Sequence, residues 1–206
     1  GLAGYSVSGH KIHGPKGIGL LVYDSKLDLN PQMHGGKQQF GVRSGTLPLP
    51  LILGLETAIK HAVEQTEQTQ NHLQSLCRYL IHGLQAMKDQ VPELDIRFNS
   101  LVDAGVTRQS PGIVNFSFTP VEGEIILHHL EAKNIFVGLG SACSAQSKKP
   151  SKILMGIGLS EEQARCSLRI SFSRNNTIEE IDQFLEAFGD AYQSLYPTFS
   201  QKAGHQ

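Results

Sequence analysis

Two residues with nucleophilic side chains, Lys11 and Cys143, lie in segments dominated by glycine and other small residues. Lys11 belongs to the run SGHKIHGPKGIG (residues 8–19), and the amine of a lysine in such a turn can form a Schiff base with an aldehyde. Cys143 belongs to the run GSACS (residues 140–144), whose small side chains leave the thiol accessible to a substrate. Two plainer interpretations stay open, a surface lysine in a turn and an inert buried thiol.

Hydroxyl and imidazole groups near Lys11 and in a later loop have the chemistry to bind a phosphate. Ser8 and His10 lie beside Lys11 and can donate hydrogen bonds, while the neighbouring glycines let the backbone come close to a ligand. Thr46 ends the run RSGT (residues 43–46), where a hydroxyl beside glycine and arginine suits an anion. An ordinary connecting loop is the alternative for this second segment.

Arg169 is the candidate for binding a carboxylate. It lies in the run CSLRISF (residues 166–172), where it alternates with apolar residues and therefore faces away from them on a strand. A guanidinium in that position can hold a carboxylate through two parallel hydrogen bonds. The alternative is a solvated charge on a strand.

The composition excludes several classes of function. The chain has 206 residues and a net charge of -1, so no basic field supports nucleic-acid binding. No apolar run approaches the roughly 20 residues that a membrane helix needs. The cysteines Cys77, Cys143 and Cys166 lack the spacing of a zinc or redox motif, and the first and last of them suit a core. Since the histidines are scattered, we expect no metal site, and free thiols favour a reducing compartment such as the cytoplasm.

The spacing of apolar residues predicts the elements that position these side chains. A short strand over residues 1–8 leads into the lysine turn, a buried strand follows over 18–23, and a Gly/Pro-rich loop occupies 30–50. A long helical region is expected from 49 to 90.

From residue 94 the pattern alternates between strand and helix. Strands are predicted over 95–99, 112–118, 134–138 and 166–171, and helices over 122–133, from near Pro150 and from Thr177 onward. The last helix opens with the capping-box pattern Thr177 to Glu180, and its tail after Tyr196 is expected to fray. The fold class is therefore α/β.

Taken together, these segments resemble the cysteine desulfurases of the NifS/IscS type, which belong to the class V aminotransferase family and to the fold-type I enzymes that use pyridoxal 5'-phosphate (PLP). The resemblance extends over about residues 5–195, and the long loop after the cysteine is similar to that of group I, the iron–sulfur-cluster branch. It is carried by SGHKIHGPKGIG at 8–19, QMHGG at 32–36, RSGT at 43–46, GIVNFSF at 112–118, EGE at 122–124, GSACS at 140–144 and GIGL at 156–159.

The resemblance implies a domain organisation. Residues 1–60 would be the end of the PLP-binding large domain, 61–92 a connecting helix, and 93–206 a complete small α/β domain that carries the cysteine. The family's enzymes are longer, and their N-terminal half supplies a phosphate loop, a histidine that stacks on the cofactor and an aspartate that pairs with its ring nitrogen. We therefore expect this chain to be the C-terminal half of such an enzyme.

The resemblance also implies a role for each candidate residue. Lys11 would hold PLP covalently and exchange protons with the substrate, with Ser8 and His10 on the cofactor phosphate. Thr46 would reach the phosphate of the partner subunit in a homodimer.

Arg169 would bind the carboxylate of L-cysteine, and Cys143 would take the substrate sulfur as a persulfide and leave L-alanine. An iron–sulfur scaffold or another acceptor protein would then receive the sulfur. Two alternatives stay open: a non-catalytic chain that dimerises or binds a scaffold, and a related enzyme such as a selenocysteine lyase.

Overall fold

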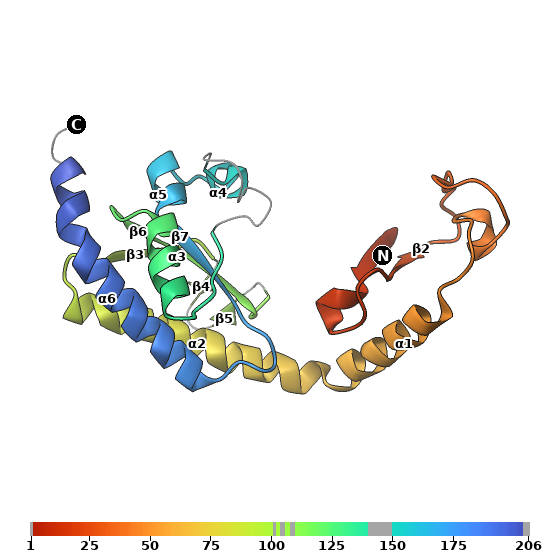
Figure 1. Cartoon of the computed structure of the whole chain (residues 1–206), viewed down its shortest axis with the longest axis horizontal. Helices are drawn as coiled ribbons and strands as arrows, with labels where there is room; N and C mark the ends of the chain where they lie inside the picture. The colour runs from red at the N-terminus through yellow and green to blue at the C-terminus, as the bar shows by residue number, and fades with distance from the viewer. Residues whose placement is uncertain (1, 101, 104–105, 108–109, 140–149, 204–206) are drawn as a thin grey trace. The chain divides into compact units, whose positions relative to one another are not determined.

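The computed structural model describes residues 2–100, 102–103, 106–107, 110–139 and 150–203 (Figure 1). Helices and strands alternate along them, so the α/β class predicted from the sequence is confirmed. The chain divides into two units, Gly1–Gln68 and Thr69–Gln206. None of the helices within the described ranges is long and apolar enough to cross a membrane.

The first unit is a two-stranded antiparallel ribbon followed by a helix. The ribbon pairs β1 (Gly4–Ser8) with β2 (Gly19–Tyr23), a short 3-10 turn η1 (Gly9–Ile12) lies between them, and a second such turn η2 (Gln39–Gly41) precedes α1 (Leu49–Glu64). The two predicted strands are present.

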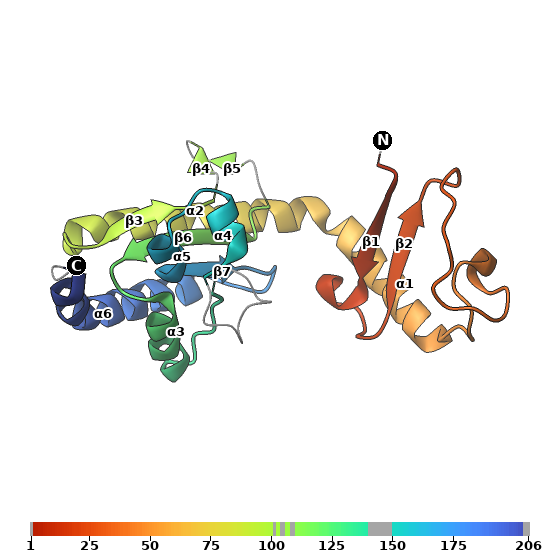
Figure 2. The ribbon, with the colours of Figure 1, turned by 90° about the horizontal axis from the view of Figure 1, so that it is seen from above.

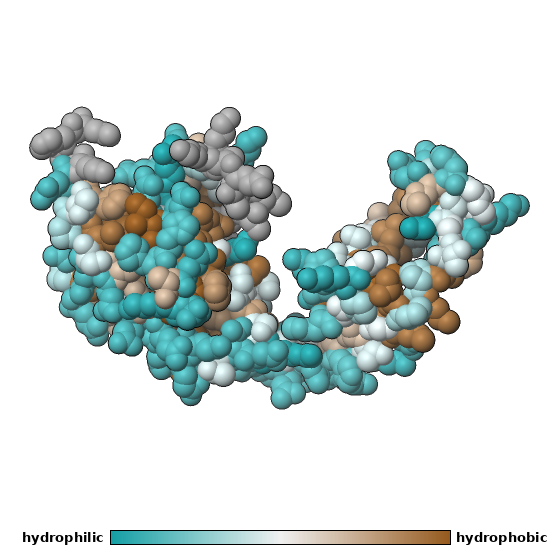
Figure 3. All heavy atoms as spheres, viewed as in Figure 1, coloured by the Kyte–Doolittle hydropathy of each residue, from teal (hydrophilic) through white to brown (hydrophobic). Residues whose placement is uncertain are grey.

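The prediction that the second strand is buried is wrong. Leu21 and Val22 are 53% and 43% exposed, and apolar residues come to the surface of this unit as brown spheres in Figure 3. The physical reason is that β1 is the one strand partner of β2 among the described residues, so no complete sheet covers its apolar side chains.

The predicted long helical region consists of two helices. α1 ends at Glu64, and α2 (Thr66–Gln90) begins directly after Gln65. The unit boundary falls after Gln68, and the buried stripe of α2 contributes to the core of the second unit. That stripe comprises Leu76, Cys77, Leu80, Ile81, Leu84 and Met87.

The second unit is built on a three-stranded antiparallel sheet with the order β3-β6-β7. Helices α2 and α6 lie on one side of the sheet, and the short helices α4 and α5 lie on the other (Figures 1 and 2). A hairpin of β4 and β5, which the sequence pattern did not reveal, precedes β6. The elements are β3 (Asp95–Phe98), β4 (Val102–Asp103), β5 (Val106–Thr107), β6 (Ile113–Thr119), α3 (Gly123–Ala132), α4 (Lys152–Gly156), α5 (Glu161–Arg165), β7 (Ser167–Ser171) and α6 (Ile178–Ala203).

Alternate residues of β6 supply the centre of the apolar core. Phe116 and Phe118 are fully buried, and both rings pack edge-on against Phe188 of α6, at centroid distances of 5.6 and 5.0 Å. Edge-to-face contacts of this kind add to the free energy gained by burying the rings. The predicted alternation of the two faces of this strand is thereby confirmed.

Of two predictions for the end of the chain, one is confirmed and one is wrong. The capping box of the last helix is confirmed, since Thr177 Oγ1 accepts the N–H of Glu180 at 3.4 Å and the Glu180 carboxylate accepts the N–H of Thr177 at 3.0 Å. The expected fraying after Tyr196 is wrong, because α6 continues to Ala203. Tyr196 and Phe199 pack against the core and so support this last stretch.

The segment predicted as a strand over 134–138 is not a strand. It begins in a turn at Asn134 and makes one bridge with a described residue, between Gly138 and Arg169 of β7. The turn before it explains the short pairing, because Asn134 has a left-handed backbone (φ 60°) and the N–H of Ile135 returns to the carbonyl of Leu130.

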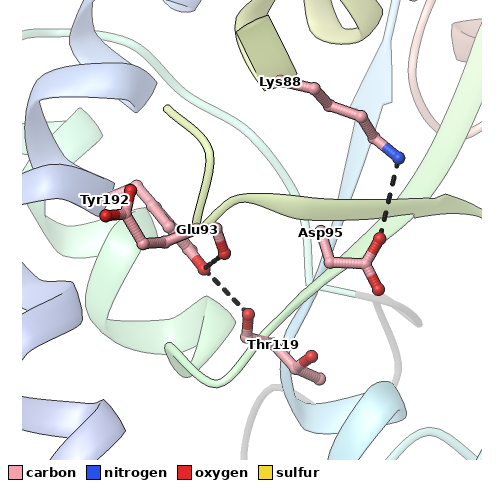
Figure 4. A network of polar contacts seen from close by, with 5 residues as sticks. All are labelled: Lys88, Glu93, Asp95, Thr119 and Tyr192. Atoms are coloured by element: carbon pink, nitrogen blue, oxygen red, sulfur yellow. Dashed lines mark hydrogen bonds and ion pairs between the residues drawn. The ribbon is translucent and has the colours of Figure 1, made fainter. Parts of the chain in front are cut away.

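The hydroxyl of Tyr192 ties α6 to the ends of two strands. It donates to the carbonyl of Thr119 at 2.8 Å and approaches the carbonyl of Glu93 at 3.2 Å, while Lys88 and Asp95 form an ion pair at 3.6 Å nearby (Figure 4). Tyr192 is fully buried, and this burial is the main cause that raises the pKa of its phenol. The buried polar group is satisfied, so it fixes where the helix meets the sheet.

Replacing Tyr192 with phenylalanine should lower the free energy of unfolding by about 0.5–1.5 kcal/mol, because the carbonyl of Thr119 loses its donor and the contact with the carbonyl of Glu93 is lost, while the ring stays packed. Urea unfolding of the purified chain measures the change. Tyr196→Phe is the matched control, since the Tyr196 hydroxyl bonds to no described residue, and it should cost less than about 0.5 kcal/mol. Equal losses in the two variants would show that the bonds of Tyr192 do not stabilise the fold.

Candidate active site

A closed turn carries Lys11. The chain leaves β1 at Ser8, passes through the 3-10 turn and reverses at His13, whose backbone is left-handed (φ 62°). The N–H of Gly9 donates to the carbonyl of Ile18 at 2.9 Å and closes the turn at its base. Gly9 has no room for a side chain, because a Cβ there would lie 3.0 Å from two carbonyl oxygens.

Helix α1 supports the turn from beneath. A Cβ at Gly54 would lie 2.6 Å from Cγ of Pro15, and a Cβ at Gly14 would lie 3.1 Å from Cβ of Ala58. Glycine at these two positions therefore lets the turn rest directly on the helix. The lysine segment is held by backbone hydrogen bonds and by this contact, so its polar side chains are not needed for the fold.

Three donor side chains project from the turn. Ser8, His10 and Lys11 are all exposed, and within the described residues none of the three has a hydrogen bond or ion pair. Since no protein group occupies them, these donors are available to a ligand. The structure thus brings three of the six predicted site residues together on one turn.

Thr46 lies on a separate loop of the same unit, where its side chain is exposed. In the described part of the chain it has no interaction with the lysine turn. Its neighbour Ser44 is buried instead and donates to the carbonyl of Met33 at 2.8 Å, while Arg43 donates to the carbonyl of Ser44 at 2.6 Å. The serine and the arginine of this loop therefore fix the loop itself and leave the threonine hydroxyl at the surface.

Arg169 lies in β7 of the second unit, on the face of the sheet opposite the apolar core. Its Nε is buried and has no hydrogen-bond partner among the residues that the structure describes. The backbone of Gly138 lies against the guanidinium, because a Cβ at Gly138 would be 3.0 Å from Nη2 and 3.3 Å from Cζ and Nε of Arg169. A buried guanidinium nitrogen without a partner is costly, so this group is suited to bind an anion.

The three cysteines differ in setting. Cys143 lies outside the described residues. Cys77 and Cys166 are buried in the second unit, as the sequence predicts, and burial raises the pKa of both thiols, that of Cys166 to about 12. A thiol that keeps its proton is a poor nucleophile, so these two are inert.

Comparison with known proteins identifies the family of this chain. The family model described as aminotransferase class-V matches residues 4–184. The chain belongs to the class-V aminotransferase family. It is 41% identical over 183 residues to a cysteine desulfurase IscS of Pseudoalteromonas translucida and 40% identical over 181 residues to one of Clostridium botulinum, with 88% of this chain covered in each case.

Solved structures of class-V aminotransferase relatives share the fold. A NifS-like protein superposes with a TM-score of 0.77 at 27% identity over 94% of this chain, and a NifS-like protein from Rickettsia africae does so with 0.75 at 27% over 94%. The predicted resemblance to NifS- and IscS-type proteins is thus confirmed. The chain spans about half the length of these relatives, 42% and 44% of the two desulfurases and 47% and 48% of the two structures.

The raised pKa of Cys166 leads to a prediction about alkaline stability. The folded value of about 12 exceeds the 9.0 of an unperturbed thiol, so the folded state holds this proton more tightly. The stabilisation is fully present below about pH 9 and is lost as the pH rises towards 12. Between pH 8 and pH 10.5 the free energy of unfolding should fall by on the order of 2 kcal/mol from this group.

Urea unfolding at several pH values measures that fall, and Cys166→Ala isolates the contribution of the thiol from other groups that titrate in the same range. The variant should be less stable at pH 8, and its stability should decline less steeply above pH 9. Parallel pH profiles for the two proteins would contradict the assignment.

Proposed function

We propose that this chain is the C-terminal half of a PLP-dependent cysteine desulfurase of group I, which converts L-cysteine to L-alanine and keeps the sulfur as a persulfide on Cys143. The observation that carries the proposal is the lysine turn, where Ser8, His10 and Lys11 are exposed on one short turn and have no partner among the described residues. The identity to proteins named cysteine desulfurase supports the reaction type. The enzyme would be a cytoplasmic homodimer that passes sulfur to an iron–sulfur scaffold or another acceptor protein.

The residues of the lysine turn fit the cofactor. A phosphate needs hydrogen-bond donors, which the Ser8 hydroxyl and the His10 ring provide, and an aldehyde needs a free amine, which Lys11 provides two positions after the buried Gly9. Thr46, exposed on its own loop, would contact the phosphate bound by the partner subunit. When bound, PLP supplies an electron sink for the bonds at the substrate α-carbon.

Each remaining residue would act on the substrate directly. The free Nε of Arg169 and its neighbouring Nη2 would bind the carboxylate of L-cysteine. Lys11 would remove a proton from the α-carbon and return it. The thiolate of Cys143 would attack the substrate sulfur, so that a sulfur–sulfur bond forms, the carbon–sulfur bond breaks, and its electron pair stays with the carbon that is protonated to give L-alanine.

Reductive trapping tests the role of Lys11. When the chain is incubated with PLP and reduced with borohydride, peptide mass spectrometry should find the adduct on Lys11, because this amine stands among the proposed phosphate donors. Lys11→Ala should abolish the adduct. Lys16→Ala is the matched control, as Lys16 is exposed on the same turn, and it should leave the adduct in place. An adduct on Lys16 in the unaltered chain would overturn the choice of lysine.

Sulfur transfer tests the role of Cys143. With PLP and L-cysteine, the peptide that contains Cys143 should gain the mass of one sulfur atom, and Cys143→Ala should abolish the persulfide and sulfide release while PLP trapping on Lys11 persists. Cys77→Ala is the control, since Cys77 is a buried thiol with a raised pKa and should not carry sulfur. A persulfide on Cys77 or Cys166 would contradict the proposal.

A further inference from the structure

The face of the sheet that carries Arg169 also carries a row of amide side chains. Asn115 of β6 is the register partner of Arg169 in β7. The backbone groups of Asn115 make their hydrogen bonds on the side away from Arg169. Its carbonyl accepts the N–H of Asn99, and its N–H donates to Oγ of Ser100, both at 2.9 Å. The backbone groups of Arg169 make theirs on the side away from Asn115. The N–H of Arg169 donates to the carbonyl of Gly138 at 2.7 Å, and its carbonyl accepts the N–H of Gly138 at 3.0 Å. The two residues thus form a non-hydrogen-bonded pair, the kind in which cross-strand side chains lie closest.

The hydrogen bonds of the row fix the orientation of the Asn115 amide. Nδ2 of Asn99 donates to Oδ1 of Asn115 and to Oγ of Ser117, both at 2.8 Å. Because Oδ1 of Asn115 must face that donor, its Nδ2 faces β7, where it donates to the carbonyl of Leu168 at 3.0 Å. A carbonyl can only accept, so the Leu168 carbonyl and Nδ2 of Asn99 together hold the Asn115 amide in one orientation, while the buried Oδ1 of Asn99 has no partner among the described residues.

The bond from the Asn115 amide to the carbonyl of Leu168 fixes β7 at the residue directly before Arg169. Asn115 is 9% exposed, so its side chain is a rigid neighbour for the arginine. On the other side, the backbone of Gly138 leaves no gap beside the guanidinium. Arg169 lies between them without any hydrogen bond to its guanidinium from the described residues, and its buried Nε is a donor without a partner there.

We propose that Asn115, locked by Asn99, is a positioning residue that holds the Arg169 guanidinium in the orientation that accepts the substrate carboxylate. The amides do not touch the substrate. They fix the strand and limit the rotamers of the arginine, so that little side-chain entropy is lost when the carboxylate binds. This inference rests on the proposed role of Arg169, and the experiment below separates the two.

The order of the Arg169 side chain is the first readout, and it needs no ligand. In the ¹⁵N-labelled chain, the Nε–Hε resonance of Arg169 is assigned by its loss in Arg169→Lys. Its order parameter should approach the value of about 0.85 of a rigid group and should fall below about 0.6 in Asn115→Ala. Ser167→Ala is the matched control, because Ser167 is buried on the same strand and also loses one hydrogen bond, to the carbonyl of Ala164.

An unchanged order parameter in Asn115→Ala would overturn the proposal, and so would an equal fall in Ser167→Ala. If Asn115→Ala does not fold, Asn99→Ala tests the proposal instead. This variant removes the hydrogen bond that orients the Asn115 amide, at the less buried end of the row. Its order parameter should fall as well, and a value equal to that of the unaltered chain would overturn the proposal.

Titration with L-alanine and L-alaninamide is the second readout, since only L-alanine has a carboxylate and neither has a thiol. The Arg169 resonance should shift with L-alanine alone, and Asn115→Ala should weaken that binding about tenfold, while Ser167→Ala should not. Equal affinity in Asn115→Ala and the unaltered chain would overturn the positioning role. No response of the unaltered chain to L-alanine would overturn the carboxylate role of Arg169, and the order parameter would still decide whether Asn115 positions it.

Discussion

The antiparallel pairing of β6 with β7 is the interaction on which the second unit depends. It gives β6 one face for the core, where Phe116 and Phe118 pack against α6, and one face for polar chemistry, where Asn115 lies opposite Arg169. Because side chains alternate strictly along a strand, a shift by one residue would exchange the two faces and bury the arginine in the core. The same pairing therefore determines both the stability of the unit and the place of its candidate carboxylate-binding group.

The first unit places its chemistry differently. Its ribbon has exposed apolar residues and its lysine turn is short, yet the turn is closed by the bond between Gly9 and Ile18 and rests on α1 through Pro15. Backbone groups and glycines hold the segment, and the polar side chains of Ser8, His10 and Lys11 have no partner in the described part of the chain. A candidate site built in this way owes its shape to the main chain, and its polar side chains are exposed.

Much of this organisation can be predicted from the sequence, because local rules act over short distances. Period-two alternation gives β6, and the spacing Thr177 to Glu180 gives the start of α6 through a capping box. The lysine turn follows from its glycines and proline. The failures have a common cause: the burial of β2, the length of α6 and the single bridge of Gly138 depend on which other elements cover or pair with the segment, and local pattern does not contain that information.

The sequence by itself determined which residues could do chemistry and to which family they belong, because the side-chain types and their order along the chain carry that information. Only the tertiary structure decided how those residues are supported. The row of Asn99 and Asn115 beside Arg169 joins segments that are distant in the chain, and it exists only because strand pairing brings them together. A polar residue within the apolar run GIVNFSF was the one signal of it, and without the register of the sheet that signal does not name its partner.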